Sequence, residues 1–177
     1  MNGLSLRNLI SRAVITAVDS ARKCQSVGLK MIAGDQKQHV EHLEPYGFTS
    51  VAQNGAEGVA LFPAGDRSHG VVVVVADRRY RLKGLKRGEV ALYDDQGQSV
   101  VLTRSGIVVN GAGKPIIFKN ASKARFEMPI ESTCDITDNC DSGGITMSQM
   151  RVTYNGHNHN ENGDGGGVTD APVQQMS

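Results

Sequence analysis

Two histidines near the C-terminus, His157 and His159, are the residues of this 177-residue chain best suited to chemistry. In an extended backbone, side chains at positions i and i+2 point to the same side, so both imidazoles can reach one metal ion. Three identical chains on a threefold axis would supply six imidazoles and fill an octahedral shell, whereas a structural zinc site needs four ligands in a tetrahedron. A His-x-His in a Gly- and Asn-rich tail can also be a solvated turn, so the upstream sequence must decide.

The composition favours short strands and tight turns over a thick core. Hydrophobic residues make up 39% of the chain and aromatic residues 5%, there is no Trp, and 21 residues are Gly. The length allows one compact domain, or a small domain with an elongated appendage. The formal net charge of +1, from 19 basic and 18 acidic residues, lacks the basic excess of a nucleic-acid-binding domain.

The chain shows no targeting or membrane-spanning signal. Arg7 and Arg12 interrupt the apolar N-terminal residues, so no signal peptide is expected. The most apolar stretch, residues 71–76, is far shorter than the ~18 residues of a membrane-spanning helix. The odd number of cysteines and the absence of a C-x-x-C pair argue against a disulfide framework. We expect buried free thiols at Cys134 and Cys140 in a reducing cytoplasm, although these two could also bridge.

The N-terminal half predicts a helix and then a small barrel. Leu4, Leu6, Leu9 and Ile10 have near-helical spacing and precede a strand-like run at 13–18, so residues 1–20 are expected to form a short helix and a lead-in strand. Residues 21–85 are predicted to form a closed barrel of the OB type, with Gly and Asp in its turns. The expected strands include residues 26–31, 59–62 and 71–75, and the five consecutive valines of the last suggest burial on both faces.

Residues 86–154 have a different sequence pattern from the barrel. Short strands at roughly ten-residue spacing are expected at 89–93, 98–102, 106–109, 124–128 and 145–147. Each supplies only a few large apolar residues on one face, so a single chain would not bury enough surface to offset its conformational entropy. Intertwining with sister chains is one solution, and a β-sandwich completed by the barrel is the other. Residues 155–177 are predicted to be an apex and Gly-rich cap.

Several segments together resemble the baseplate assembly protein V family, the central spikes of contractile-tailed phages, and within it the Mu-type spikes. The resemblance runs from about residue 9 to about residue 175 and rests on residues 41–48 (EHLEPYGF), 55–59 (GAEGV), 63–70 (PAGDRSHG), 88–94 (GEVALYD) and 157–159 (HNH).

This resemblance implies an all-β, non-enzymatic homotrimer. Its parts would be an N-terminal OB-fold barrel, an intertwined β-helix shaft and a metal-bound apex. His157 and His159 match the family's ligand pair, so three chains would hold one iron in six histidine nitrogens. The protein would be made in the host cytoplasm without a signal peptide and would lie in the virion at the tip of the tail baseplate. Its expected partners are the baseplate hub protein and, by mechanical contact, the host outer membrane, with no nucleic acid.

The cap is longer than the family pattern, because residues 160–166 separate the histidines from the Gly-x-Thr-x-x-Pro segment. The longer cap adds Asp164 and Asp170, which could hold a hard cation such as calcium near the axis or serve as turn residues.

Two other functions remain as alternatives. The first is a monomeric OB-fold binding module with a metal-binding tail. The second is a hydrolase using Ser142, because the sequence Asp-Ser-Gly-Gly also surrounds a protease nucleophile. The flanking Gly and Pro of that protease motif are missing, so we expect Ser142 in a turn. Asp135, Asp138 and Asp141 do not have EF-hand spacing and are also expected in turns.

Overall fold

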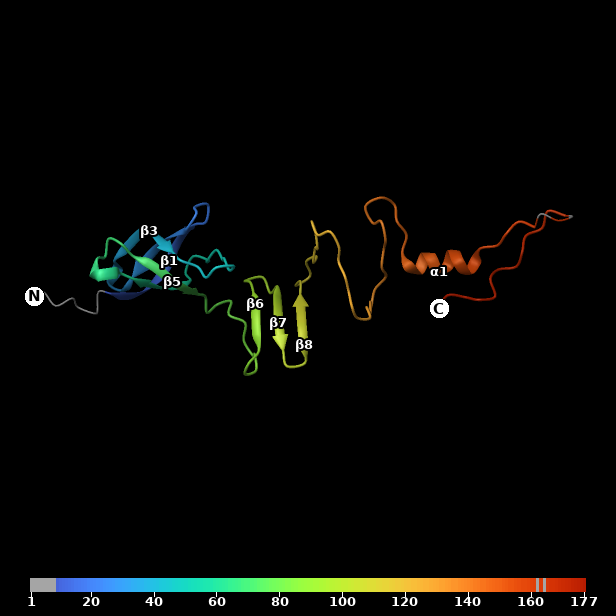
Figure 1. The fold of residues 1–177 in the computed structure, drawn as a ribbon. Helices are drawn as coiled ribbons and strands as arrows, with labels where there is room; N and C mark the ends of the chain where they lie inside the picture. Colours follow the sequence, from blue (N-terminus) through green and yellow to red (C-terminus); the bar gives the residue numbers. More distant parts are fainter. Residues whose placement is uncertain (1–8, 162, 164) are drawn as a thin grey trace, which may run out of the picture. The chain divides into compact units, whose positions relative to one another are not determined.

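A computed structural model of the chain describes residues 9–161, 163 and 165–177, which form mostly β-structure with little helix (Figure 1). They fall into two compact units that divide between Ile117 and Phe118. The strands of the first unit are β1 (Ile10–Asp19), β2 (Gln25–Met31), β3 (Gln36–His42), β4 (Glu57–Leu61), β5 (Val71–Ala76), β6 (Val90–Tyr93), β7 (Ser99–Thr103) and β8 (Gly106–Asn110), with short 3-10 turns at Ile32–Gly34 and Pro63–Gly65. The helix α1 (Met147–Gly156) belongs to the second unit.

The first five strands form a closed barrel in the order β1-β2-β3-β5-β4. β1 is antiparallel to both β2 and β4, and β3 runs parallel to β5, with Glu41 opposite Val71. A bulge between Ile15 and Ala17 interrupts the register of β1 with β2. Such a bulge bends a strand, which lets the ten-residue β1 leave β4 and continue along β2. Closure pairs the barrel edges and confirms the predicted small barrel.

The hydrophobic core of the described residues lies inside this barrel. Its largest fully buried side chains come from β1, β2, β5 and the residue that follows β4, and they are Phe62, Ile15, Leu29, Val27 and Val72. Along β2, Val27, Leu29 and Met31 alternate toward the interior, as a strand requires. The alternation in sequence therefore accounts for the barrel without any contribution from residues beyond β5.

Three expectations about this half need correction or remain outside the structure. The strand expected as a lead-in before residue 21 is β1, a full member of the barrel, because it pairs with β2 and β4. The valines of β5 are not buried on both faces, since Val72 is buried while Val73 and Val74 are exposed. Most of the expected N-terminal helix falls in residues 1–8, outside the described residues, and Ile10 already begins β1.

The strands β6, β7 and β8 form an antiparallel meander in the predicted places. Asp94 begins the first hairpin turn, where its carboxylate accepts hydrogen bonds from the backbone N–H groups of Gln96 and Gln98 at 2.9 and 2.8 Å. The Gln98 side chain and these N–H groups hold the pKa of Asp94 below its usual value. Gly97 has a φ of +88°, which glycine adopts without strain. The turn chemistry thus sets the register of the sheet.

One face of this sheet is entirely apolar. Residues directly opposite in an antiparallel sheet share a face, so the observed register places six apolar side chains together. They are Val90, Leu92, Val100, Leu102, Ile107 and Val109. None of these six is buried, and the Leu92 and Ile107 side chains are 64% and 71% exposed. The sheet therefore presents a hydrophobic face that its own chain leaves uncovered.

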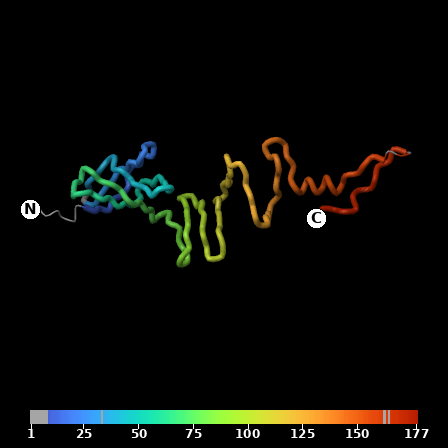
Figure 2. Tube along the Cα trace, in the orientation of Figure 1, coloured from blue at the N-terminus to red at the C-terminus, as the bar shows by residue number. Residues whose placement is uncertain are grey.

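Residues 111–146 form no regular strand in the structure, and their backbone instead makes long reversals (Figure 2). The strand predicted at 124–128 is absent, and the one predicted at 145–147 is replaced by the start of α1. A local capping box explains this second difference: the Thr146 hydroxyl accepts from the Gln149 N–H, and the Gln149 side chain accepts from the Thr146 N–H. No helix among the described residues is long and apolar enough to cross a bilayer.

We predict that Phe62→Ala will destabilise the barrel strongly. Phe62 is 1% exposed, and truncating a buried phenylalanine costs about 3–5 kcal/mol through lost transfer energy and a residual cavity. Urea unfolding followed by circular dichroism measures the change. Ile32→Ala is the control, because Ile32 is 79% exposed and its truncation should stay within ~0.5 kcal/mol. Equal effects of the two substitutions would contradict the core described above.

Candidate metal-binding site

The end of α1 positions the first of the two C-terminal histidines. α1 ends at Gly156, and His157 is the C-cap with φ −72° and ψ 150°, so the backbone becomes extended at that residue. At the other end of the helix, Asp135 accepts hydrogen bonds from the backbone N–H and hydroxyl of Ser148. These bonds, the Ser148 hydroxyl first, lower the pKa of Asp135 to about 2. Asp135 thus fixes the start of α1, and His157 lies directly after its last residue.

The imidazole of His157 is held by the carbonyl oxygen of Tyr154, 2.6 Å from Nδ1. A carbonyl oxygen only accepts hydrogen bonds, so Nδ1 carries a proton, and in the neutral imidazole Nε2 then keeps a free lone pair. Metal-bound histidines commonly show this arrangement, because a hydrogen bond from the other ring nitrogen fixes the tautomer and the ring orientation. The Tyr154 ring also lies near, with its centroid 5.4 Å from that of His157.

A second set of bonds positions His159. Its backbone N–H donates to the Thr169 hydroxyl at 2.9 Å, and the Thr169 N–H donates to the His159 carbonyl at 2.8 Å. A further bond joins the Glu161 N–H to the Gly167 carbonyl, so the cap folds back on the segment that carries the histidines. The two imidazole centroids lie 5.2 Å apart at an interplanar angle of 84°. The folded-back cap therefore keeps the two imidazole rings close together.

In the described part of the chain, the apex brings two candidate metal ligands together. Among the described residues, no group of three or more His, Cys, Asp or Glu side chains could hold a metal ion. The pair His157 and His159 fits the donor chemistry of a transition metal, because imidazole suits zinc, copper, iron and nickel, but the other ligands must come from elsewhere. His157 and His159 are the pair predicted from sequence, and their role as metal ligands stays a prediction.

The calcium prediction concerns two aspartates of the cap, Asp164 and Asp170. Asp164 lies outside the described residues. Asp170 follows Thr169, which pairs with His159, but no described metal-binding group includes it. Its role therefore remains the expectation drawn from the sequence.

The other candidate residues have structural roles in the described part of the chain. The Ser142 N–H donates to the Asn139 carbonyl in a turn, as expected. Asp66 accepts from the Ser68 hydroxyl and N–H, which lower its pKa to about 2, and its second carboxylate oxygen lies 3.1 Å from Nδ1 of His69. The Ser68 hydroxyl contacts the same Nδ1. A catalytic triad needs the two partners on opposite ring nitrogens, so this cluster is a turn.

The cysteines differ from expectation. Cys134 and Cys140 are free but exposed in this chain, whereas buried thiols were predicted. The segment that carries them has no core of its own, because every described residue from 118 to 143 is exposed. Asp138, between the two cysteines, accepts from the Ile145 N–H at 3.3 Å, which is the turn role expected for it.

Sequence reasoning missed the groups that orient the histidines. The Tyr154 carbonyl is a backbone atom, so no residue type predicts it. The sequence marks Thr169 only as part of the Gly-x-Thr-x-x-Pro segment of the cap. Its hydrogen bond with His159 depends on how the chain folds back, which the sequence does not show.

Comparison with known proteins gives a consistent set of relatives. A family model described as "Bacteriophage Mu Gp45, N-terminal" matches residues 12–79. The baseplate puncturing device gp45 of Escherichia phage Mu is 34% identical over 101 residues, which are 57% of this chain and 51% of the phage protein. The Mu-like prophage FluMu protein gp45 of Haemophilus influenzae is 31% identical over 165 residues, 88% of each chain. The match thus spans about half of the phage Mu protein and most of the prophage protein.

We predict that metal-free His157 will be the neutral tautomer with its proton on Nδ1. The hydrogen bond to the Tyr154 carbonyl requires it. Nitrogen-15 chemical shifts of labelled histidine, read above the pH at which the imidazole protonates, distinguish the two tautomers. Exposed His69, whose Nδ1 faces a carboxylate and a hydroxyl, serves as an internal comparison. A proton on Nε2 of His157 would contradict the geometry.

Proposed function

Because this chain belongs to the phage Mu gp45 family, we propose that it is the central spike of a phage tail baseplate, acting as a homotrimer that pierces the host outer membrane. The family membership and the relative called a baseplate puncturing device support this role. The barrel, which we take to be of the OB type, would dock on the baseplate hub. The C-terminal apex would meet the membrane first, and the work would be mechanical, with no catalysis.

The observation that carries the proposal is the lack of burial beyond the barrel. No described residue after Val72 is buried. Large apolar side chains from Val90 to Met176 remain exposed, including Phe118 at 86% and Val152 at 73%. Each such side chain would be worth about 1.5–3 kcal/mol if buried, so the lone chain forgoes the main force that holds a fold together. Sister chains can supply the missing cover.

The sheet of β6, β7 and β8 suggests how the chains combine. Its order leaves β6 and β8 as edges, and exposed edges present unpaired N–H and C=O groups to other strands. Three copies could pair at these edges and turn their apolar faces inward. No strand of such an intertwined β-helix could peel away without breaking bonds to its neighbours, which gives the stiffness that a piercing rod needs.

The apex would be closed by iron. His157 and His159 of three chains offer six imidazole nitrogens, and the bond from His157 to the Tyr154 carbonyl leaves Nε2 available as a ligand. The metal would cross-link the three chains where too few residues remain to build a core. Calcium at Asp164 or Asp170 is a further possibility within the cap.

The second candidate function is a monomeric OB-fold binding module with a metal-binding tail. The closed barrel with its own core would allow it. A monomer would leave the apolar face of β6, β7 and β8 exposed to solvent, so we prefer the trimeric spike.

The first prediction concerns assembly. The purified protein should have three times the chain mass of 18.9 kDa in light scattering, and Leu92→Asp should break the trimer because it places three charges in one apolar core. Ser99→Asp is the matched control, since Ser99 lies on the other face of the sheet. A folded monomer of the unaltered protein, with its full strand content, would refute the trimer.

The second prediction concerns the apex. Elemental analysis should find one iron per three chains, and the double variant His157→Ala and His159→Ala should lose it while light scattering still shows a trimer. His69→Ala, another exposed histidine, should leave the iron in place. Retention of one metal per trimer by the double variant would exclude these ligands.

A further inference from the structure

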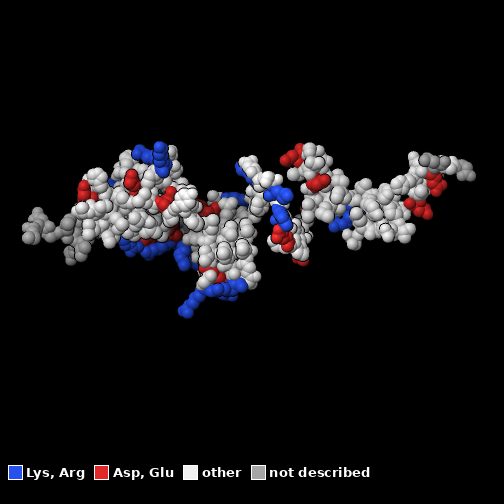
Figure 3. Space-filling view, viewed as in Figure 1, with Lys and Arg blue, Asp and Glu red and all other residues white. Residues whose placement is uncertain are grey.

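The segment that links the barrel to the next sheet is strongly basic. Residues 78–87, here named the collar, contain six of the 19 Lys and Arg residues and no acidic residue. The rest of the chain then carries 13 basic against 18 acidic residues, so the excess positive charge of the protein is local. On the face shown in Figure 3, Lys and Arg side chains gather where the barrel leads into the sheet of β6, β7 and β8.

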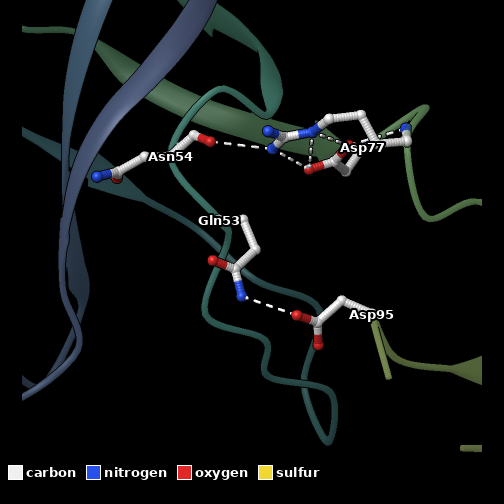
Figure 4. Close-up of polar contacts among 5 residues, drawn as sticks. Gln53, Asn54, Asp77 and Asp95 are labelled. Carbon is white, nitrogen blue, oxygen red and sulfur yellow. Dashed lines mark hydrogen bonds and ion pairs between the residues drawn. The ribbon is translucent and has the colours of Figure 1, made fainter. Parts of the chain in front are cut away.

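Two of the six cations are already paired with the barrel. The Arg78 guanidinium lies 2.9 Å from Glu57. Arg79 binds Asp77 at 2.6 Å and also donates to the Asn54 carbonyl, as the upper group of contacts in Figure 4 shows. These bonds fix the start of the collar to the barrel. Its position next to the barrel is therefore defined by the barrel's own side chains.

The other four cations have no ion pair within residues 9–161, 163 and 165–177. They are all exposed, and they are Arg81, Lys83, Lys86 and Arg87. Nearby Glu89 forms no ion pair with them; its carboxylate accepts the backbone N–H groups of Lys86 and Arg104, and its one charge, which interacts with that of Lys86, offsets only part of the four. Four like charges within seven residues repel one another, so the segment has charge available for an anionic partner.

Apolar side chains stand between these cations. Tyr80 is 40% exposed, Leu85 is 37% exposed, and Leu82 is half-buried. Beyond the turn at its start the collar has no helix or strand, so its side chains can adapt to a surface. Basic residues mixed with Tyr and Leu suit the interface of a bilayer, where cations meet phosphates and the apolar groups enter the acyl boundary.

We propose that the collar binds the phosphate groups of an anionic lipid surface. A nucleic acid is less suited, because single-strand recognition uses stacked aromatic platforms and the collar has only Tyr80, which the Arg79 guanidinium already covers at 5.3 Å. The proposal rests on the proposed function in one respect, since a trimer would carry three collars and so twelve unpaired cations. A spike would thereby grip the lipid headgroups once its barrel reaches the membrane.

The test is flotation of the full-length protein with vesicles. The parent should bind vesicles that contain phosphatidylglycerol and not vesicles of pure phosphatidylcholine, and binding should fall as sodium chloride rises. The variant Arg81→Gln, Lys83→Gln, Lys86→Gln and Arg87→Gln should bind about a thousandfold more weakly, given the contribution of each cation near an anionic surface. The control Lys23→Gln, Lys30→Gln, Lys119→Gln and Lys123→Gln removes four exposed cations elsewhere and should bind as the parent does.

Any of the following results would overturn the inference: undiminished binding by the collar variant, an equal loss in the control variant, equal binding of the parent to pure phosphatidylcholine, or displacement by inorganic phosphate at constant ionic strength. If the collar variant instead loses binding to duplex DNA and keeps its binding to vesicles, the collar is a nucleic-acid site and the inference is also overturned. Light scattering on the same samples separates the two proposals. A trimer that ignores anionic vesicles refutes the collar alone, and a monomer refutes the spike.

Discussion

The constraint on which the rest of the structure depends is that the chain can cover its own apolar side chains only inside the barrel. The barrel closes because β1 bends at its bulge to pair with both β2 and β4, and its interior is filled by residues such as Phe62 and Leu29. In β6, β7 and β8 the same alternation of apolar residues recurs, but no second layer of described residues buries it. A sheet with a free hydrophobic face is stable only when another layer buries it.

The apex follows from the same constraint. Along α1 and the folded-back cap no described residue is buried, and hydrogen bonds rather than a core hold the segment together. The Tyr154 carbonyl orients the His157 ring, and the Thr169 hydroxyl holds the His159 backbone, so the two rings lie 5.2 Å apart within one chain. Preorganisation of this kind lowers the cost of binding. A metal shared between chains would then stabilise the part of the molecule that hydrophobic burial cannot.

The barrel and the sheet of β6, β7 and β8 were predictable because apolar alternation and turn residues such as Gly97 act locally. The closeness of the His157 and His159 rings also followed from their spacing, whereas their metal binding stays a prediction. The helix α1 was missed although Thr146 and Gln149 have the spacing of a capping box, because the apolar residues around them also suit a strand. The exposure of Val73 and of the cysteines could not be predicted, since burial depends on which elements lie opposite.

Hydrogen exchange measured by mass spectrometry tests most directly whether the core beyond the barrel lies between chains. The decisive segment is β7, whose residues are not buried in the single chain, compared with β2, whose core residues are. If sister chains cover the sheet, the amides of β7 will be protected as long as those of β2 in the native protein. Rapid exchange throughout β7 while β2 stays protected would contradict the account.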